Sequence, residues 1–220
     1  MDTVKQFEMS LGEKERRVFS RLSSSAKIQA FLDQIPYCDD DFYRSPLSLL
    51  RDRKACCLDS ALFAAAALRR LGHIPLIVEL IAENDDDHII AIYKRNEFFG
   101  AIAKSNFVGL RFREPIYRSL RELIMSYFEF YYNLNGEKTL RSYSVPLNLR
   151  SFDKINWMVC DDNLEAIAQQ LDKIRKVPLL IPRMIRSLSY VDTRTYEAGM
   201  LGAETDAIYK PRKKTPRTKP

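Results

Sequence analysis

One stretch, residues 55–75, constrains the fold of this chain more than any other. It reads ACCLDSALFAAAALRRLGHIP, and alanine and leucine fill most of its central turns. Alanine has the highest helix propensity and the shortest side chain that favours a helix, so the pattern predicts a helix over 56–71 that packs closely against several neighbours. Gly72 follows it, as glycine often does just beyond a helix C-terminus.

The residues after this helix predict a small antiparallel sheet. Residues 74–81 are almost continuously apolar and β-prone, which is typical of a strand with both faces buried. Two further strands are expected over 88–93 and 98–104, and the acidic residues 83–87 form a solvated turn before the first of them. Gly100 lies inside the third strand, where glycine indicates a bulge or a close backbone approach.

Helical spacing and breaker residues suggest the remaining elements. A strand over 141–149 contains Pro146, which cannot donate a ladder hydrogen bond, so we expect it at an edge of the sheet. Asp161 or Asp162 is expected to cap the last helix. Periodic apolar residues predict helices over 13–22, 26–35, 46–51, 115–134 and 164–174.

The net charge of +6 comes from the end of the chain. Residues 210–220 read KPRKKTPRTKP and contain six basic residues and no acidic one, which leaves 29 of the 35 basic residues against 29 acidic ones elsewhere. A neutral body argues against a dedicated nucleic-acid-binding domain. The polar, proline-rich tail is predicted to be disordered, with at most weak contact to the phosphates of a nucleic acid.

Cysteine and histidine usage excludes the common metal sites. The two histidines and four cysteines contain no CxxC pair, so no zinc site and no cofactor are expected. The longest apolar run, 61–68, is too short to cross a bilayer, and the first twenty residues lack a secretory signal. We therefore expect a cytoplasmic protein with no membrane partner and with reduced thiols at Cys38, Cys56, Cys57 and Cys160.

The order of the chemistry-bearing residues is informative. A cysteine begins the alanine-rich helix, and His88 begins the second strand after it. A thiol becomes a good nucleophile as a thiolate, which the unpaired N–H groups at a helix N-terminus stabilise. A neighbouring imidazole can exchange the proton, and a third polar group can orient that imidazole. The pattern therefore favours nucleophilic cysteine chemistry.

These residues resemble the transglutaminase-like superfamily of papain-related Cys–His–Asp enzymes. The resemblance covers residues 50–105 and includes the leucine-arginine-rich end of the helix and the Gly-His-Ile-Pro turn. Counting back from Gly72 places the family nucleophile at Cys57, with Asp59 as the acid two residues beyond it and His88 as the family histidine. The resemblance implies an α+β fold with a papain-like core, in which the cysteine helix packs on a small antiparallel sheet with extra helices around it.

On this basis the chain divides into four parts. Residues 1–45 form an N-terminal helical segment, and residues 46–182 form the transglutaminase-like domain with its flanking helices. Residues 183–209 are an extension whose structure the sequence leaves open, and residues 210–220 are the basic tail.

The third member of the catalytic group departs from the family pattern, because no acid follows Glu97 in the third strand. Asn106 can orient a histidine, as asparagine does in papain-like enzymes, and Ser105 fits the spacing equally well. Arg111 and Arg113 are candidates for binding a substrate carboxylate, although paired surface arginines are more often solvated or salt-bridged.

The function predicted is cysteine-dependent acyl transfer, preferably hydrolysis of a peptide or isopeptide bond in a peptide or protein substrate. Cys57 is the nucleophile, and His88 is the base and acid. The alternative is a catalytically silent binding or accessory module with the same fold, which the missing acid favours.

Overall fold

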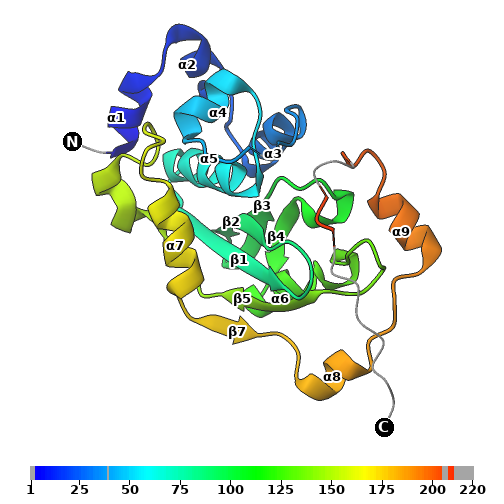
Figure 1. The fold of residues 1–220 in the computed structure, drawn as a ribbon. Coiled ribbons are helices and arrows are strands. Elements are labelled where there is room, and N and C mark those ends of the chain that lie inside the picture. Colours follow the sequence, from blue (N-terminus) through cyan, green and yellow to red (C-terminus); the bar gives the residue numbers. More distant parts are fainter. Residues whose placement is uncertain (1–2, 39, 205–207, 211–220) are drawn as a thin grey trace.

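The computed structural model describes residues 3–38, 40–204 and 208–210, and this part of the chain has an α+β fold built around an antiparallel sheet (Figure 1). The seven strands of the described sheet are β1 Leu76–Ala82, β2 His88–Arg95, β3 Phe98–Ile102, β4 Arg113–Tyr117, β5 Leu140–Ser144, β6 Leu147–Asn148 and β7 Lys176–Pro178. The strand order is β4-β3-β2-β1-β5-β7, and β6 pairs with β1 beside β5.

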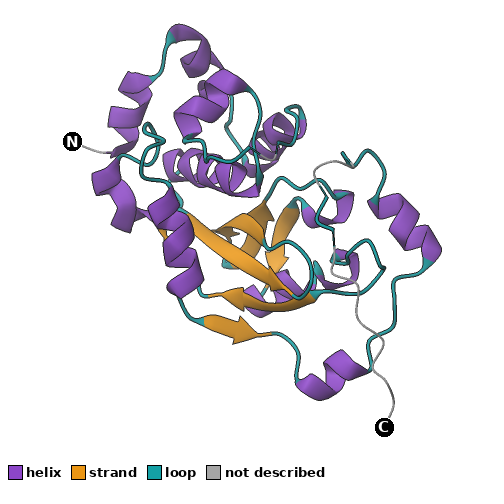
Figure 2. Cartoon of the chain, viewed as in Figure 1, coloured by secondary structure: helices purple, strands orange, loops and turns teal. Residues whose placement is uncertain are grey.

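The helices lie around this sheet (Figure 2). The α-helices of the described residues are α1 Thr3–Ser10, α2 Glu13–Ser20, α3 Ser25–Asp33, α4 Pro46–Asp52, α5 Cys57–Arg70, α6 Leu120–Met125, α7 Glu165–Lys173, α8 Pro182–Arg186 and α9 Thr193–Gly199. Short 3-10 helices are η1 Val108–Leu110, η2 Phe128–Phe130 and η3 Leu149–Ile155.

The alanine-rich helix predicted over 56–71 is α5, and it lies at the centre of one side of the molecule. Its residues from Leu58 to Leu68 are all buried. Phe63 stacks on Phe31 of α3 with ring centroids 5.0 Å apart and meets Phe19 of α2 edge-on at 6.1 Å. The helix ends before Gly72, whose φ of +92° is favourable only for glycine. The helix therefore joins the N-terminal helices to the sheet, as its composition predicts.

Both faces of the central strands are covered. Ile77, Ala91 and Tyr93 belong to the core beneath α5, whereas Ile90 and Ile92 belong to a second core on the opposite face. Alternating side chains of a strand point to opposite faces, so β1 and β2 need apolar residues at almost every position. This confirms the prediction of a central strand, which begins at Leu76 rather than at residue 74, where Ile74 is exposed.

The third strand approaches its neighbours closely at Gly100. A Cβ at this position would lie 2.7 Å from the ring of Tyr93 and 3.0 Å from the carbonyl oxygen of Arg113. The pairing of β3 with β4 also shifts register around Gly100. The glycine thus marks both an irregularity and a close approach, as expected.

The long helix predicted over 115–134 is wrong. Pro115 lies in β4, Ser119 caps the short helix α6, and the aromatic residues that follow lie in η2 and in extended chain. Tyr127 and Tyr131 are buried in the second core even though no continuous helix carries them. Buried aromatic residues three or four apart fit a chain of short turns as well as they fit one helix, so their spacing misled the prediction.

Two further predictions near the C-terminal half are corrected. The strand expected at an edge is interior, because β5 pairs with β1 on one side and with β7 on the other. Pro146 still ends it, since it lies between β5 and β6. Asp161 does not cap α7: its carboxylate accepts hydrogen bonds from the Ser45 N–H at 2.7 Å and from the Ser48 hydroxyl at 2.8 Å. It therefore fastens α4 to the segment before α7.

The extension that the sequence left open contains α8 and α9, and Figure 1 shows α9 on the far side of the sheet from α1 and α2. Apart from Lys210, the basic tail 210–220 lies outside the described residues. No helix of the described chain is both long and apolar enough to span a bilayer.

Candidate active site

Cys57 is the first residue of α5, and the backbone around it is fixed by an aspartate. The Asp59 side chain is fully buried and accepts the N–H of Cys56 at 3.2 Å and the N–H of Arg44 at 2.8 Å. An acid at the third helical position that binds the residue before the helix is a common N-terminal cap. Asp59, two residues beyond Cys57, therefore sets the geometry of the helix start.

Arg44 places a buried positive charge beside the start of α5. Its side chain is 1% exposed, and its guanidinium contacts the carboxylates of Asp40, Asp52 at 2.9 Å and Asp59 at 3.8 Å. It also lies 3.5 Å from the sulfur of Cys38. Burying a cation without a paired anion costs free energy, so these carboxylates stabilise the buried Arg44 guanidinium. The cluster ties the segment before α4 to the first turn of α5.

His88 begins β2 beneath this turn, opposite Leu80 of β1. Its residue is 5% exposed, and its Nε2 lies 2.9 Å from the carbonyl oxygen of Leu110. A carbonyl oxygen only accepts hydrogen bonds, so Nε2 must carry a proton and Nδ1 is the nitrogen left for proton exchange. The group that orients the imidazole is thus a backbone carbonyl.

The structure brings the Cys57 thiol and the His88 ring together. A hydrogen bond from the Cys56 side chain, and then the contact with His88 and the N–H of Ile89, lower the pKa of Cys57 well below the usual value for a thiol, against the opposing effect of burial. The same hydrogen bond, burial and nearby negative charge raise the pKa of Cys56. Of the two side chains, Cys57 is therefore the one that more readily forms a thiolate, whereas Cys56 remains a thiol.

The loop that presents the Leu110 carbonyl is held from beneath by the second core. The Tyr127 hydroxyl donates to the carbonyl oxygen of Arg111 at 2.9 Å. The Arg113 guanidinium donates to the carbonyl oxygen of Gly109 at 2.8 Å and to the hydroxyl of Ser126 at 2.9 Å, and it lies over the Tyr127 ring. The residues on both sides of Leu110 are therefore anchored.

The acidic turn before His88 is also anchored rather than open. Asp85 accepts the Thr139 hydroxyl at 2.6 Å, and Asp87 accepts the N–H of Ala82 at 2.7 Å. The buried Tyr131 donates its hydroxyl to the carbonyl oxygen of Asp86 at 2.6 Å. Within the described ranges, no three or more His, Cys, Asp or Glu side chains gather in a way that would hold a metal ion.

Asn106 and Ser105 lie near His88, but their recorded hydrogen bonds go elsewhere. Ser105 accepts the N–H of Phe107 through its hydroxyl at 3.0 Å. The Asn106 amide donates to the carbonyl oxygen of Glu204 at 2.9 Å and accepts the N–H of the same residue at 2.7 Å. Both side chains shape the surface beside the histidine, while the Leu110 carbonyl takes the orienting position.

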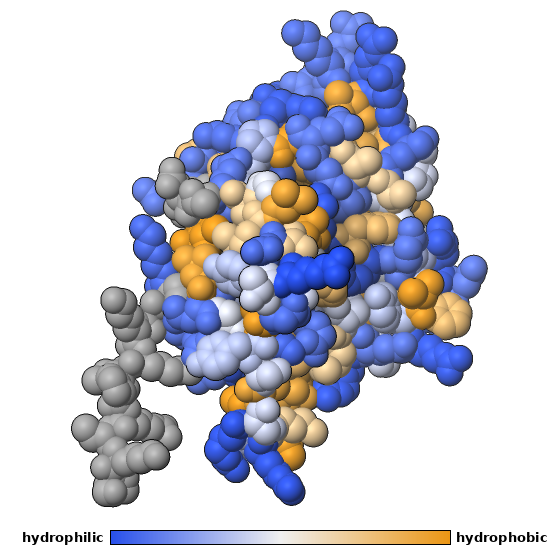
Figure 3. Space-filling model, turned by 90° about the vertical axis from the view of Figure 1, so that its right-hand side faces the viewer, coloured by the Kyte–Doolittle hydropathy of each residue, from blue (hydrophilic) through white to orange (hydrophobic). Residues whose placement is uncertain are grey.

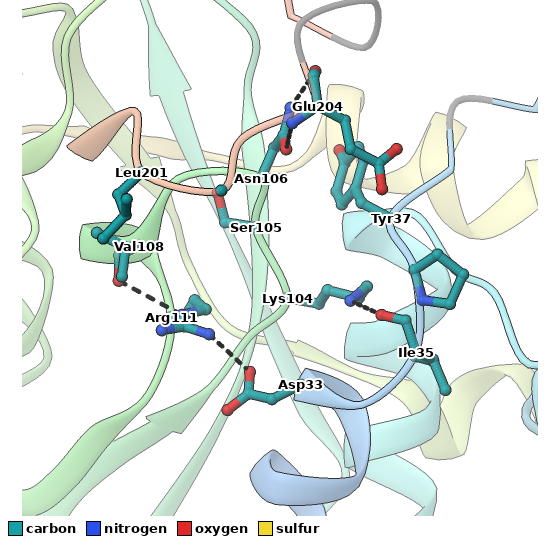
Figure 4. Close-up of a pocket in the computed structure, with 12 residues that line it drawn as sticks. Asp33, Ile35, Tyr37, Lys104, Ser105, Asn106, Val108, Arg111, Leu201 and Glu204 are labelled. Atoms are coloured by element: carbon teal, nitrogen blue, oxygen red, sulfur yellow. Dashed lines mark hydrogen bonds and ion pairs between the residues drawn. The ribbon is translucent and has the colours of Figure 1, made fainter. Parts of the chain in front are cut away.

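The two candidate substrate-binding arginines have different surroundings. Arg113 lies beneath the loop, where its donors bind backbone and hydroxyl oxygens. Arg111 is partly exposed, pairs with Asp33 at 3.2 Å, and lines a pocket of about 310 Å³ together with Lys104 (Figure 4). Of the two, Arg111 has its side chain at a pocket.

Sequence reasoning missed Arg44, Leu110 and the two tyrosines. The Leu110 carbonyl belongs to the backbone, so its role has no side-chain signature. Arg44 follows the acids at 39–41, and an arginine beside a run of acids normally reads as a solvated charge pair. The tyrosine spacing reads as a helix face. Only the three-dimensional arrangement identifies these contributions.

Comparisons with known proteins give distant structural likenesses. No family model matches the chain, and no curated protein matches it. Among solved structures, the chain is similar to Legionella pneumophila LapG, with a TM-score of 0.32, 15% identity, and coverage of 45% of this chain and 68% of that one. The EGTA-treated form of LapG gives a TM-score of 0.32, 15% identity, and coverage of 46% and 67%.

Proposed function

We propose that this protein is a cysteine-dependent acyl-transfer enzyme that hydrolyses an amide bond in a peptide or protein. The observation that carries the proposal is the contact between Cys57, at the first turn of α5, and His88, whose ring is oriented by the Leu110 carbonyl. A nucleophile, a proton-exchanging base and a group that orients the base are the parts such a reaction needs.

The reaction proceeds in two steps. In the first, the Cys57 thiolate attacks the carbonyl carbon of the substrate, the C–N bond breaks, and the protonated His88 gives its Nδ1 proton to the leaving amine. In the second, neutral His88 takes a proton from water, the hydroxide attacks the thioester, and the carboxylic acid leaves as Cys57 is regenerated. No external oxidant, reductant or metal is required for this sequence.

The negative charge that develops on the substrate oxygen needs hydrogen-bond donors. The N–H groups of a first helical turn have no partner within the helix and point outward from its N-terminus. In this proposal the Cys57 N–H stabilises the oxyanion, and the positive end of the α5 dipole adds to the effect.

Alkylation at low reagent concentration tests the proposal. Iodoacetamide at pH 6.5, followed by mass spectrometry of a digest, is expected to label Cys57 before the three other cysteines, because its lowered pKa favours the reactive thiolate. His88→Ala should slow this labelling about tenfold, since one of the groups that stabilise the thiolate is lost. Cys57→Ala should abolish the fast phase.

The alternative is a silent module with the same fold, and the uncharged orienting group favours it. A carbonyl stabilises an imidazolium less than a carboxylate does. If Cys57 reacts no faster than an ordinary exposed thiol and His88→Ala leaves its rate unchanged, while thermal unfolding shows both proteins folded, the silent module is the better account.

A further inference from the structure

The surface next to His88 consists of two pockets that share a wall. The smaller pocket is lined by His88, Tyr131, Tyr37, Ser105 and Asn106. The larger one is the pocket of Figure 4, and three of the same residues line it: Tyr37, Ser105 and Asn106. A ligand lying along the larger pocket therefore passes directly beside the histidine. Asn106 stands where the two pockets meet.

Asn106 binds a peptide unit of the chain's own C-terminal segment. Its side-chain amide donates to the carbonyl oxygen of Glu204 at 2.9 Å and accepts the N–H of Glu204 at 2.7 Å (Figure 4). Both bonds go to backbone atoms, so the Glu204 side chain has no part in them. A primary amide has one donor group and one acceptor, which match the two polar groups of one residue in an extended peptide.

The charged groups of the larger pocket are occupied by the protein itself. The Lys104 ammonium donates to the carbonyl oxygens of Leu32 at 3.0 Å and Ile35 at 2.5 Å. Arg111 pairs with the carboxylate of Asp33. Both cations of the pocket are thus bound within the protein, and the carboxylates of Asp33 and Glu204 also line it, so the pocket suits an uncharged peptide backbone better than a free anion.

The segment from Met200 to Glu204 rests on this surface through its backbone rather than through buried side chains. Before it, the Tyr132 hydroxyl donates to the carbonyl oxygens of Thr195 at 2.9 Å and Tyr196 at 3.3 Å, which fastens α9. Leu201 is 78% exposed, and Glu204 is exposed as well. On this side of the molecule, hydrophobic residues are interspersed with hydrophilic ones (Figure 3). Little side-chain burial opposes the release of this segment.

We infer that Asn106 is a substrate-backbone-binding residue, and that the peptide unit of Glu204, which follows the turn at the end of α9, takes in cis the hydrogen bonds that Asn106 would make to a substrate peptide. The inference rests on the proposed function and specifies its substrate class: a peptide that Asn106 binds through the backbone N–H and carbonyl oxygen of one residue. The chain's own segment competes with such a peptide, because tethering gives it an effective concentration in the millimolar range. The segment therefore acts as a built-in competitor.

Peptide binding tests the inference without depending on catalysis. Glu204→Pro removes the N–H that binds Asn106, whereas the matched control Glu204→Ala keeps it. A fluorescein-labelled peptide with the sequence of residues 199–208 is titrated into the full-length proteins, and its anisotropy is measured. We expect Glu204→Pro to bind the peptide about tenfold more tightly than the unaltered chain and the control, because the competitor is released. Adding Asn106→Ala to Glu204→Pro should abolish this gain.

The outcomes separate this inference from the proposed function. Equal peptide affinity for Glu204→Pro and Glu204→Ala, or a gain that survives Asn106→Ala in a protein with an unchanged melting temperature, overturns the inference. Fast alkylation of Cys57 combined with either of these results overturns the inference and leaves the proposed function in place. Binding that depends on Asn106 supports the peptide groove even where Cys57 proves unreactive, a result that removes the proposed function alone.

Discussion

At the scale of single residues, the two adjacent cysteines have opposite roles. Cys57 carries the lowered pKa, and the Cys56 side chain is the first cause of that lowering. A hydrogen bond donated to a thiolate stabilises its charged form and so lowers its pKa. Cys56 is therefore a positioned donor to the thiolate, and its own pKa is raised in return.

This division of roles predicts the behaviour of two substitutions at one position. Cys56→Ala removes the donor, so the pKa of Cys57 rises and alkylation at pH 6 slows by about tenfold. At pH 9 the thiolate forms without help, and the rates of the two proteins should converge. Cys56→Ser keeps an O–H donor and should retain most of the rate at pH 6. The measurement is the pH profile of iodoacetamide labelling at Cys57, from pH 5 to 9.

A different result would remove Cys56 from the site. If Cys56→Ala and Cys56→Ser give the same profile as the unaltered chain, the helix terminus and His88 suffice to stabilise the thiolate. A parallel thermal unfolding curve for each variant shows that the comparison is made between folded proteins.

At the scale of elements, the start of α5 depends on a loop distant from the sheet. Arg44 pairs with three acids around the first turn of the helix, and one of them, Asp59, is fully buried. Removing one partner of a buried ion pair leaves a buried charge uncompensated, which costs about 3–5 kcal/mol. Cys57, at the first position of α5, is thus placed by a charge cluster whose cation, Arg44, lies before it in the chain.

Replacement of Arg44 tests this dependence. Arg44→Met should lower the free energy of unfolding by about 3 kcal/mol, which is about 6–12 °C in melting temperature for a chain of this length. The matched control is Arg51→Met, which removes an ion pair between Glu15 and a 53% exposed arginine at 3.3 Å. That change should cost less than about 1 kcal/mol. Calorimetry of both variants measures the decrease in unfolding free energy. Similar decreases for the two would show that the burial of Arg44 does not contribute to stability.

Elements with a strong local signature were predictable from the sequence. The alanine-rich helix has one of the clearest signatures, and α5 begins and ends within one residue of the range 56–71. The strands after it are doubly buried, so their continuous apolar runs identify them. Residues 115–134 were not predictable, because their aromatic side chains fill one core from several short elements. The spacing of these aromatic residues reflects their burial. The path of the backbone is instead set by Pro115, which lies in β4, and by Ser119, which caps α6.

The same distinction applies to the candidate site. Cys57 and His88 each begin an element that the sequence marks, so their proximity follows from packing α5 on β2. The orienting group belongs to a loop held by Tyr127 and Arg113, and no local pattern around Leu110 predicts it. A side chain that donates to a backbone oxygen elsewhere in the chain does so at no fixed sequence spacing, so the sequence alone does not reveal the contact.

At the scale of the whole molecule, the sheet separates two hydrophobic cores. Leu62 of α5 is fully buried in the core beneath the N-terminal helices, and Leu123 of α6 is fully buried in the other. The strands β1 and β2 contribute side chains to both cores. Because the same strands contribute to both cores, loss of one core removes support from the other.

The two cores should therefore unfold together. Leu62→Ala and Leu123→Ala are each expected to cost about 2–5 kcal/mol, and each should shift a single cooperative transition to lower temperature. Differential scanning calorimetry, compared with tyrosine and tryptophan fluorescence, checks this. Two separated transitions in either variant would contradict it and would show that one face of the sheet survives without the other.

The backbone nature of the histidine's partner has a consequence for variation in this protein. Every amino acid carries a carbonyl, so no replacement at position 110 can delete the acceptor, provided that the side chain still fills the space of a buried leucine. In a saturation mutagenesis library, positions 57 and 88 should be intolerant, whereas position 110 should accept other apolar residues and yet reject a one-residue deletion or insertion nearby. The residue type at position 110 can therefore change during evolution, while the number of residues between His88 and this position stays fixed. An alignment searched for a third invariant side chain will overlook such a site.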